Sequence, residues 1–85
     1  MYQETQQQIR TFLLEAIQYE ALQNDDDIFE KGFVNSLFAM QLVLFVEQAF
    51  NVTVENDDLN LDNFRSVDAI TNLVAHKSGM LVGAL

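Results

Sequence analysis

The sequence lacks several kinds of residue, and each absence excludes a class of protein. It contains no cysteine, no proline and only three glycines. Without cysteine, neither disulfide bonds nor a thiolate metal site can stabilise the chain, so the fold must rest on packing alone. The hydrophobic share of 49% is too high for a disordered chain. These features are compatible with a small globular fold in a reducing compartment.

Basic residues are also scarce. Four lysines and arginines stand against thirteen acidic residues, which gives a net charge of −9. A charge of this sign repels phosphate backbones and anionic membrane surfaces, so we expect no nucleic-acid partner and no membrane partner. The acidic excess either favours partners with basic patches or serves only solubility.

Long hydrophobic runs are absent as well. No apolar stretch approaches the roughly 20 residues that span a bilayer, and the first four residues lack the basic start of a signal peptide. We therefore expect a cytoplasmic monomer in which residues 1–85 form a single domain. A chain of this length buries only a modest core, which argues against a deep enzyme cleft.

Apolar residues at three- and four-residue spacing predict a first helix over residues 4–22. Its stripe consists of Ile9, Phe12, Leu13, Ala16, Ile17, Ala21 and Leu22. An aspartate-rich turn then opens a long loop that lasts to residue 34. Phe33 and Val34 are expected to pin the end of this loop against the core.

A second helix is expected over residues 36–50. Its core face is assigned to Ala39, Leu42, Val43, Val46, Ala49 and Phe50. The opposite face carries Leu37, Gln41, Leu44 and Gln48, flanked by Phe38, Met40 and Phe45. A helix that is apolar on nearly all sides is either buried throughout or presents an interaction surface, and a chain this short offers little to bury it twice.

The remaining residues predict an extended connector, a short helix and a closing helix. The connector covers residues 51–54, which are β-like but have no partner strand. The short element lies within residues 55–64 and turns Leu59, Leu61 and Phe64 inward. Ser66 caps the closing helix, which ends at residues 77–79 and whose core face consists of Val67, Ile70, Leu73 and Val74. Residues 80–85 either extend this helix or fray. The fold class is all-α, a small four-helix bundle.

One serine stands where a hydroxyl would be accessible. The segment Gly32-Phe33-Val34-Asn35-Ser36-Leu37 leads directly into the second helix. Serine favours the N-cap of a helix, because its oxygen accepts a hydrogen bond from an amide of the first turn. A phosphodiester there would meet unpaired N–H groups and the positive end of the helix dipole. We therefore expect Ser36 to be the N-cap of the second helix, where it is either only a cap or also a site of phosphate attachment.

This segment resembles the modification site of acyl and peptidyl carrier proteins, in which a glycine three or four residues upstream precedes Asp-Ser-Leu. The resemblance covers nearly the whole chain and implies a bundle of acyl-carrier type with a long loop between its first two helices. It also implies a carrier that is not an enzyme. Its Ser36 would bear a 4′-phosphopantetheine arm from coenzyme A, on which an acyl intermediate is held as a thioester.

A narrower resemblance involves residues 35–43 and 62–70. Both stretches look like stand-alone carriers of polyketide, antibiotic and hybrid peptide pathways that handle methoxymalonyl, hydroxymalonyl or aminomalonyl extender units. The implied partners are a phosphopantetheinyl transferase, an acyl- or aminoacyl-loading enzyme, and the acyltransferase, dehydrogenase or synthase modules of the pathway. The expected partner-binding residues are Asn35, Leu37, Phe38, Met40, Gln41, Leu44, Glu47, Gln48, Asp57 and Asp58.

The chain departs from the family pattern at two places. Asn35 replaces the usual aspartate before the serine, which removes a charge that family synthases meet with a basic group. Fatty-acid carriers are rich in acids along the second helix, whereas here Glu47 is the only acid between residues 36 and 50. We therefore expect dedicated partner enzymes rather than the fatty-acid set.

Two other functions remain open at this stage. The chain could be an aminoacyl or D-alanyl carrier, whose motif spacing is similar. Alternatively, it could be an acidic helical interaction module in which Ser36 only caps a helix. We expect no metal site and no catalytic residue, because the single histidine, His76, has no second ligand and no oxyanion hole is evident for a pair with Ser36.

Overall fold

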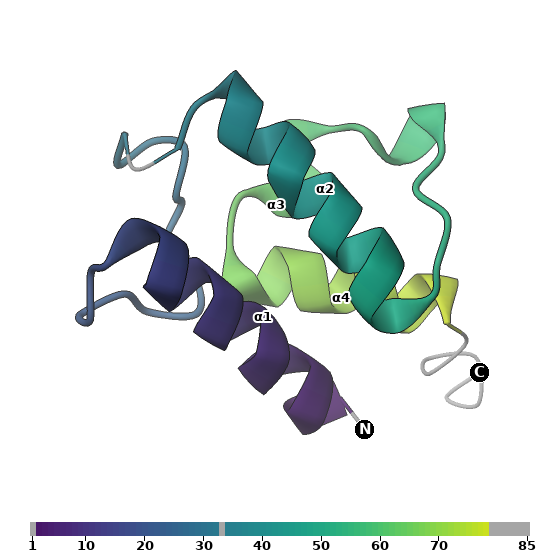
Figure 1. The fold of residues 1–85 in the computed structure, drawn as a ribbon, viewed down its shortest axis with the longest axis horizontal. Helices are drawn as coiled ribbons and strands as arrows, with labels where there is room; N and C mark the ends of the chain where they lie inside the picture. Colours follow the sequence, from purple (N-terminus) through teal and green to yellow (C-terminus); the bar gives the residue numbers. More distant parts are fainter. Residues whose placement is uncertain (1, 33, 79–85) are drawn as a thin grey trace.

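The computed structural model describes residues 2–32 and 34–78, and in this part of the chain it contains helices and no strand. The elements are α1 (Tyr2–Ile17), α2 (Ser36–Phe50), the 3₁₀ turn η1 (Asn56–Asp58), α3 (Leu61–Phe64) and α4 (Val67–Lys77) (Figure 1). The predicted all-α bundle of three longer helices and one short helix is confirmed. Among the described residues, none of the helices has the length and apolar character needed to cross a membrane.

Helix α1 is shorter than predicted. It ends at Ile17 because Gln18 adopts a left-handed conformation, with φ of 59°, and its N–H donates to the carbonyl of Leu14 at 2.7 Å. Such ends usually occur at glycine or asparagine, so glutamine gave no stop signal. Leu22 is fully buried although it lies in the loop, whereas Ala16 and Ala21 are exposed. The predicted stripe was therefore wrong at both alanines.

Helix α2 has the predicted bounds. It ends where Asn51 enters the left-handed region, with φ of 54°, a conformation that asparagine tolerates. On its core face Leu42 and Val46 are fully buried, and Ala49 is exposed, contrary to expectation. The remaining predicted core residues are half-buried, namely Ala39, Val43 and Phe50. The opposite face is exposed as predicted, at Leu37, Gln41, Leu44 and Gln48.

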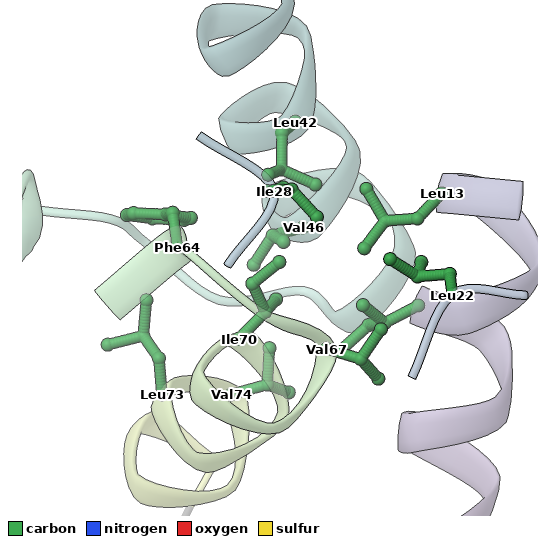
Figure 2. Packing of buried hydrophobic residues seen from close by; sticks show 11 residues of the cluster. Leu13, Leu22, Ile28, Leu42, Val46, Phe64, Val67, Ile70, Leu73 and Val74 are labelled. Carbon is green, nitrogen blue, oxygen red and sulfur yellow. The ribbon is translucent and has the colours of Figure 1, made fainter. Parts of the chain in front are cut away.

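The core forms around α4, against which α1 and α3 both pack. Figure 2 shows side chains from α1, α2, α3 and α4 converging on one cluster, together with Leu22 and Ile28 of the long loop. The residues in this cluster are Ile9, Leu13, Leu22, Ile28, Leu42, Val46, Phe64, Val67, Ile70, Leu73 and Val74. The predicted core face of the closing helix is thereby confirmed.

Aromatic rings join α2 to α1. Phe12 stacks on Phe45, with ring centroids 4.1 Å apart, and lies 5.9 Å from the ring of Phe38. Phe45 in turn forms a T-shaped pair with Phe50. Because of these contacts Phe38 and Phe45 are half-buried and pack against the core.

The loop between α1 and α2 is tied to the far end of the chain. The N–H of Ile28 donates to the carbonyl of Arg65 at 2.7 Å, and the N–H of Asp68 donates to the carbonyl of Asn24 at 2.9 Å. Arg10 of α1 also donates to the side chain of Asn24. Val34 packs against the core as predicted, while Phe33 lies outside the described residues. The loop therefore reaches Ser36 from a fixed base.

The segment between α2 and α3 differs from expectation at two leucines. Leu59 and Leu61 are exposed at 53% and 65%, so their predicted inward orientation was wrong, whereas Phe64 is buried as predicted. Since α3 has a single turn, only one of its apolar side chains reaches the core. The connector expected over residues 51–54 begins instead with the left-handed Asn51, and residues 52–54 form neither helix nor strand.

Helix α4 begins and ends as predicted. Ser66 is its N-cap and accepts a hydrogen bond from the N–H of Ala69 at 3.0 Å. The helix ends at Lys77. The expectation for residues 80–85 falls outside the described part of the chain.

Candidate functional site

Ser36 is the first residue of α2, and the residue before it is the cap. Asn35 has extended backbone angles, and its Oδ1 accepts a hydrogen bond from the N–H of Phe38 at 3.0 Å. The expectation that Ser36 itself caps the helix was therefore wrong. Asparagine is as good an N-cap as serine, and the two adjacent residues compete for one role. The outcome leaves the Ser36 hydroxyl outside the hydrogen bonds of the first turn.

The Ser36 hydroxyl is accessible. The residue is exposed, and in residues 2–32 and 34–78 nothing hydrogen-bonds to its side chain. No acidic residue lies in the first turn of α2. A phosphate on this oxygen would lie beside the unpaired N–H groups of a 15-residue helix and at the positive end of its dipole. The surroundings of the hydroxyl thus fit a phosphodiester.

Gly32 makes the turn that leads to this site. Its φ of 78° lies in the left-handed region, which residues with a Cβ rarely adopt. A Cβ built there would meet nothing within 4 Å, so the backbone conformation rather than crowding calls for glycine.

An apolar groove begins beside Ser36. A cavity of ≈500 Å³ is lined by Phe29, Val34, Asn35, Ser36, Ala39, Met40 and Leu61. It adjoins a second cavity of ≈230 Å³, which shares four of these residues and adds Val43, Leu59, Asn60 and Phe64. One wall is therefore α2, and the other combines the long loop with the residues before and within α3. Among the described residues, none that lines either cavity is charged.

The outer face of α2 carries no free charge. Leu37, Met40 and Leu44 are exposed at 69%, 60% and 53%. The one acid of the helix, Glu47, is half-buried and accepts a hydrogen bond from the N–H of Val54 at 2.9 Å. This carboxylate stabilises the connector and is engaged within the molecule.

Asp58 is engaged within the molecule too. Its Oδ2 lies 2.6 Å from Nζ of Lys77 and accepts a hydrogen bond from the N–H of Glu55 at 2.9 Å. The Lys77 hydrogen bond and then the backbone bond lower the pKa of the Asp58 carboxyl. Asp58 in turn raises the pKa of Lys77. Among the expected partner-binding acids, only Asp57 is exposed without a partner in the described residues.

The histidine and the serine lie in different depressions. His76 is exposed and lines a cavity of ≈410 Å³ together with Asp58, Asp62 and Asn72, whereas Ser36 lines the groove along α2. A cavity of ≈490 Å³ over Phe12 and Phe45 is lined by glutamines, glutamates and Thr11, and neither His76 nor Ser36 lines it. In the described residues no group of three or more His, Asp or Glu side chains could hold a metal ion.

The sequence prediction missed the second wall of the groove. Phe29, Val34 and Leu61 all line the cavity beside Ser36, yet none was expected there. The sequence alone gave no signal for Leu61; the structure shows that Leu59 and Leu61 flank Asn60, whose backbone is extended. Residues two apart along extended backbone point to one side, so both leucines belong to the same surface.

The family of domains described as the phosphopantetheine attachment site matches residues 7–74, well over half of the chain. The chain therefore belongs to this family. Its members are carriers without catalytic activity of their own, they bear covalently attached 4′-phosphopantetheine, and they interact with a phosphopantetheinyl transferase and with biosynthetic enzymes. No curated protein matches the sequence closely enough to count as a relative.

Proposed function

We propose that Ser36 is the attachment residue and that the protein presents an acyl group to the enzymes of a pathway that uses an unusual extender unit. The observation that carries the attachment is the exposed hydroxyl at the N-terminus of α2, to which none of the described residues hydrogen-bonds. The extender-unit assignment rests on the resemblance of residues 35–43 and 62–70 to such carriers.

Asn35, Ser36 and the N-terminus of α2 have separate roles in the proposed attachment. Asn35 caps α2, so the serine oxygen stays available to a transferase. The helix terminus offsets the charge of the attached phosphate. When bound, the prosthetic group supplies a terminal thiol that holds the acyl group. The protein itself supplies a fixed base and the surface that enzymes meet.

We assign this surface to the outer face of α2, at Leu37, Met40, Gln41, Leu44 and Gln48, all of which are exposed. Asn35 and Phe38 form its edge, and Asp57 is the available acid. Transient docking of a carrier suits a small surface of this kind. Glu47 and Asp58 contribute indirectly, since each stabilises the segment that follows α2.

Intact mass after coexpression with a broad phosphopantetheinyl transferase tests the attachment. The wild type should gain the mass of the prosthetic group, and Ser36→Ala should not. Ser78→Ala is the matched control, because Ser78 is also exposed but lies at the end of α4. Full modification of Ser36→Ala, or none of the wild type with several active transferases, would contradict the assignment.

Loading separates the two carrier types. The holo protein should accept an extender-type acyl group from its dedicated loading enzyme and should not be charged by an adenylating amino-acid ligase. Efficient aminoacylation would favour the aminoacyl or D-alanyl carrier instead.

A further inference from the structure

The side-chain amide of Asn35 has a fixed orientation. Its Oδ1 accepts a hydrogen bond from the N–H of Phe38 at 3.0 Å, and only the oxygen of an amide can accept such a bond. Nδ2 therefore keeps two N–H groups that can only donate. Asn35 is exposed, and within residues 2–32 and 34–78 no acceptor takes these groups. One end of the side chain thus caps α2, while the other has no partner among the described residues.

The cap also uses an N–H group that a phosphate would otherwise find. In the first turn of α2, the N–H groups of Ser36, Leu37 and Phe38 have no acceptor within the helix. Asn35 takes that of Phe38, and the next one, on Ala39, donates to the carbonyl of Asn35 at 3.0 Å. At most two backbone N–H groups of this turn are therefore open to a phosphate. The charged oxygens of a phosphodiester can accept more hydrogen bonds than these two groups supply.

The cavity beside Ser36 offers few other donors. It measures ≈500 Å³, and besides Ser36 and Asn35 its lining is apolar, namely Phe29, Val34, Ala39, Met40 and Leu61. Among the described residues that line it, Asn35 is thus the only one with a side-chain N–H group. The nearest basic residue in sequence, Lys31, lies 4.0 Å from Asp26. A phosphodiester adds negative charge to a chain that already has a net charge of −9. The amide of Asn35 is the side-chain donor best placed to offset it.

We propose that Asn35 is the positioning residue of the attached phosphate, because its Nδ2 donates to a phosphate oxygen of the prosthetic group on Ser36 while its Oδ1 caps α2. The proposal rests on the proposed function of Ser36. A hydrogen bond to a charged oxygen is stronger than one between neutral groups. This bond fixes the side of Ser36 on which the phosphate lies, and thereby the direction in which the arm leaves the protein.

The usual aspartate of the family pattern could not make this contact. An ionised carboxylate only accepts hydrogen bonds, and the oxygen that replaces Nδ2 would repel the phosphate. The departure from the pattern at Asn35 therefore replaces a repulsive neighbour of the phosphate with a donor.

The first test follows the Asn35 amide by proton NMR in the apo protein and in the holo protein made with a phosphopantetheinyl transferase and coenzyme A. The two Nδ2 protons are identified by their loss from the spectrum of Asn35→Gly. Modification should move one of them downfield and slow its exchange with water by about threefold, since a bonded proton exchanges only when the bond opens. Asn72 is the control, because its oxygen is likewise occupied, by the Tyr2 hydroxyl, but it lies on α4. Its amide protons should not change.

The second test follows the phosphate by phosphorus NMR. The resonance of holo Asn35→Gly should move toward that of the holo wild type unfolded in urea, because the phosphate has lost its donor. Glycine is tolerated at an N-cap, so this variant should stay folded. Asn72→Ala removes an amide from α4 and should keep the wild-type resonance.

Stability separates a donor to the phosphate from a cap alone. If Asn35 only caps α2, Asn35→Gly should raise the equilibrium constant for unfolding by the same factor in the apo and holo proteins. The proposed bond predicts that this factor is about threefold larger in the holo protein. Urea unfolding of the wild type and of Asn35→Gly, each in both forms, measures the two factors.

The outcomes are distinguishable. A wild type that is never modified, or full modification of Ser36→Ala, overturns the proposed function and this inference together. A modified wild type with unchanged Asn35 amide protons and equal stability factors overturns only the inference about Asn35. A changed phosphorus resonance in Asn35→Gly, with unchanged amide protons in the holo wild type, would show that the substitution acts through the end of α2, and it would also overturn the bond to the phosphate.

Discussion

Asn35 and Ser36 are adjacent residues with separate roles, and substitutions can distinguish them. Asn35→Ala removes the cap and should lower the free energy of unfolding by about 0.5–2 kcal/mol. Asn35→Asp should preserve stability, because aspartate also caps and its charge suits a helix N-terminus. Ser36→Ala should change stability by no more than about 0.5 kcal/mol, as is usual for exposed positions. Urea unfolding of the three variants provides the measurement, and a larger loss for Ser36→Ala than for Asn35→Ala would show that the serine is the cap.

The ion pair between Asp58 and Lys77 predicts that the stability of the protein depends on pH. The pKa of Asp58 is lowered in the folded protein, so its contribution to stability is present above its unfolded pKa and is lost as the pH falls through the folded value. The pKa of Lys77 is raised, so its contribution is complete below its unfolded pKa and is lost as the pH rises through the folded value. Asp58→Asn should therefore be less stable than the wild type at neutral pH.

The difference between these two proteins should shrink as the pH falls below about 4, the range in which aspartate protonates. Urea midpoints from pH 7 to pH 2 measure it. Asp57→Asn is the control, since the neighbouring carboxylate is exposed and has no partner among the described residues. A constant difference for Asp58→Asn across this range would show that the ion pair does not stabilise the fold.

At the scale of the helix, α2 has one buried and one exposed leucine only two positions apart. Leu42 is fully buried and Leu44 is 53% exposed. Leu42→Glu should unfold the protein, because an unpaired charge would enter the core. Leu44→Glu should leave the melting temperature nearly unchanged and reduce turnover by partner enzymes. Thermal melting beside a transfer assay measures both, and a collapsed melt of Leu44→Glu would show that the face is core.

Helical periodicity predicted the helices that pack one apolar face against the core. The bounds of α2 and the buried side of α4 followed from it, while the cap at Ser66 followed from the preference of serine for that position. The end of α1 did not, because a left-handed glutamine leaves no signature in sequence. Leu59 and Leu61 were misassigned because hydrophobicity alone does not say whether a residue in a short turn has a core within reach.

The position of Ser36 at the start of α2 was predictable, and the arrangement of the residues around it was less so. The motif located the serine at the start of α2, but the choice of Asn35 as the cap depends on backbone angles that the sequence does not give. The groove forms because the long loop and the α3 segment lie next to each other. Tertiary hydrogen bonds, such as that from the Ile28 N–H to the Arg65 carbonyl, hold them together. Likewise, Glu47 and Asp58 were expected to face partners, yet local backbone N–H groups and Lys77 engage them.

At the scale of the whole molecule, charge is distributed so that, among residues 2–32 and 34–78, no lysine or arginine side chain is without a partner. The chain has four basic residues, and each has a partner within the molecule. Arg10 donates to Asn24, whereas Lys31, Arg65 and Lys77 lie within 4.0 Å of aspartates. The excess of acid therefore dominates the field around the protein, while the outer face of α2 stays uncharged. Long-range attraction to basic partners and short-range apolar docking are thus separated in space.

This separation predicts which enzymes reject the carrier. A fatty-acid malonyl transferase that docks through basic groups should transfer poorly to the holo protein, because α2 offers it no free acid. The combined change Asn35→Asp, Gln41→Glu and Gln48→Glu should improve transfer by about tenfold at low salt, if each exposed pair contributes about 0.5 kcal/mol. Phe38 is left unchanged because it stacks on Phe12.

Position, rather than net charge, should cause this improvement. Gln3→Glu, Gln7→Glu and Gln8→Glu add the same three charges to exposed positions of α1 and should give little gain. The gain from the α2 changes should also shrink as salt is raised, since exposed charges are screened beyond roughly 10 Å at 0.1 M. Steady-state transfer at several ionic strengths measures both effects. If the α1 and α2 variants improve equally, the acidic field as a whole selects partners and the uncharged face of α2 does not.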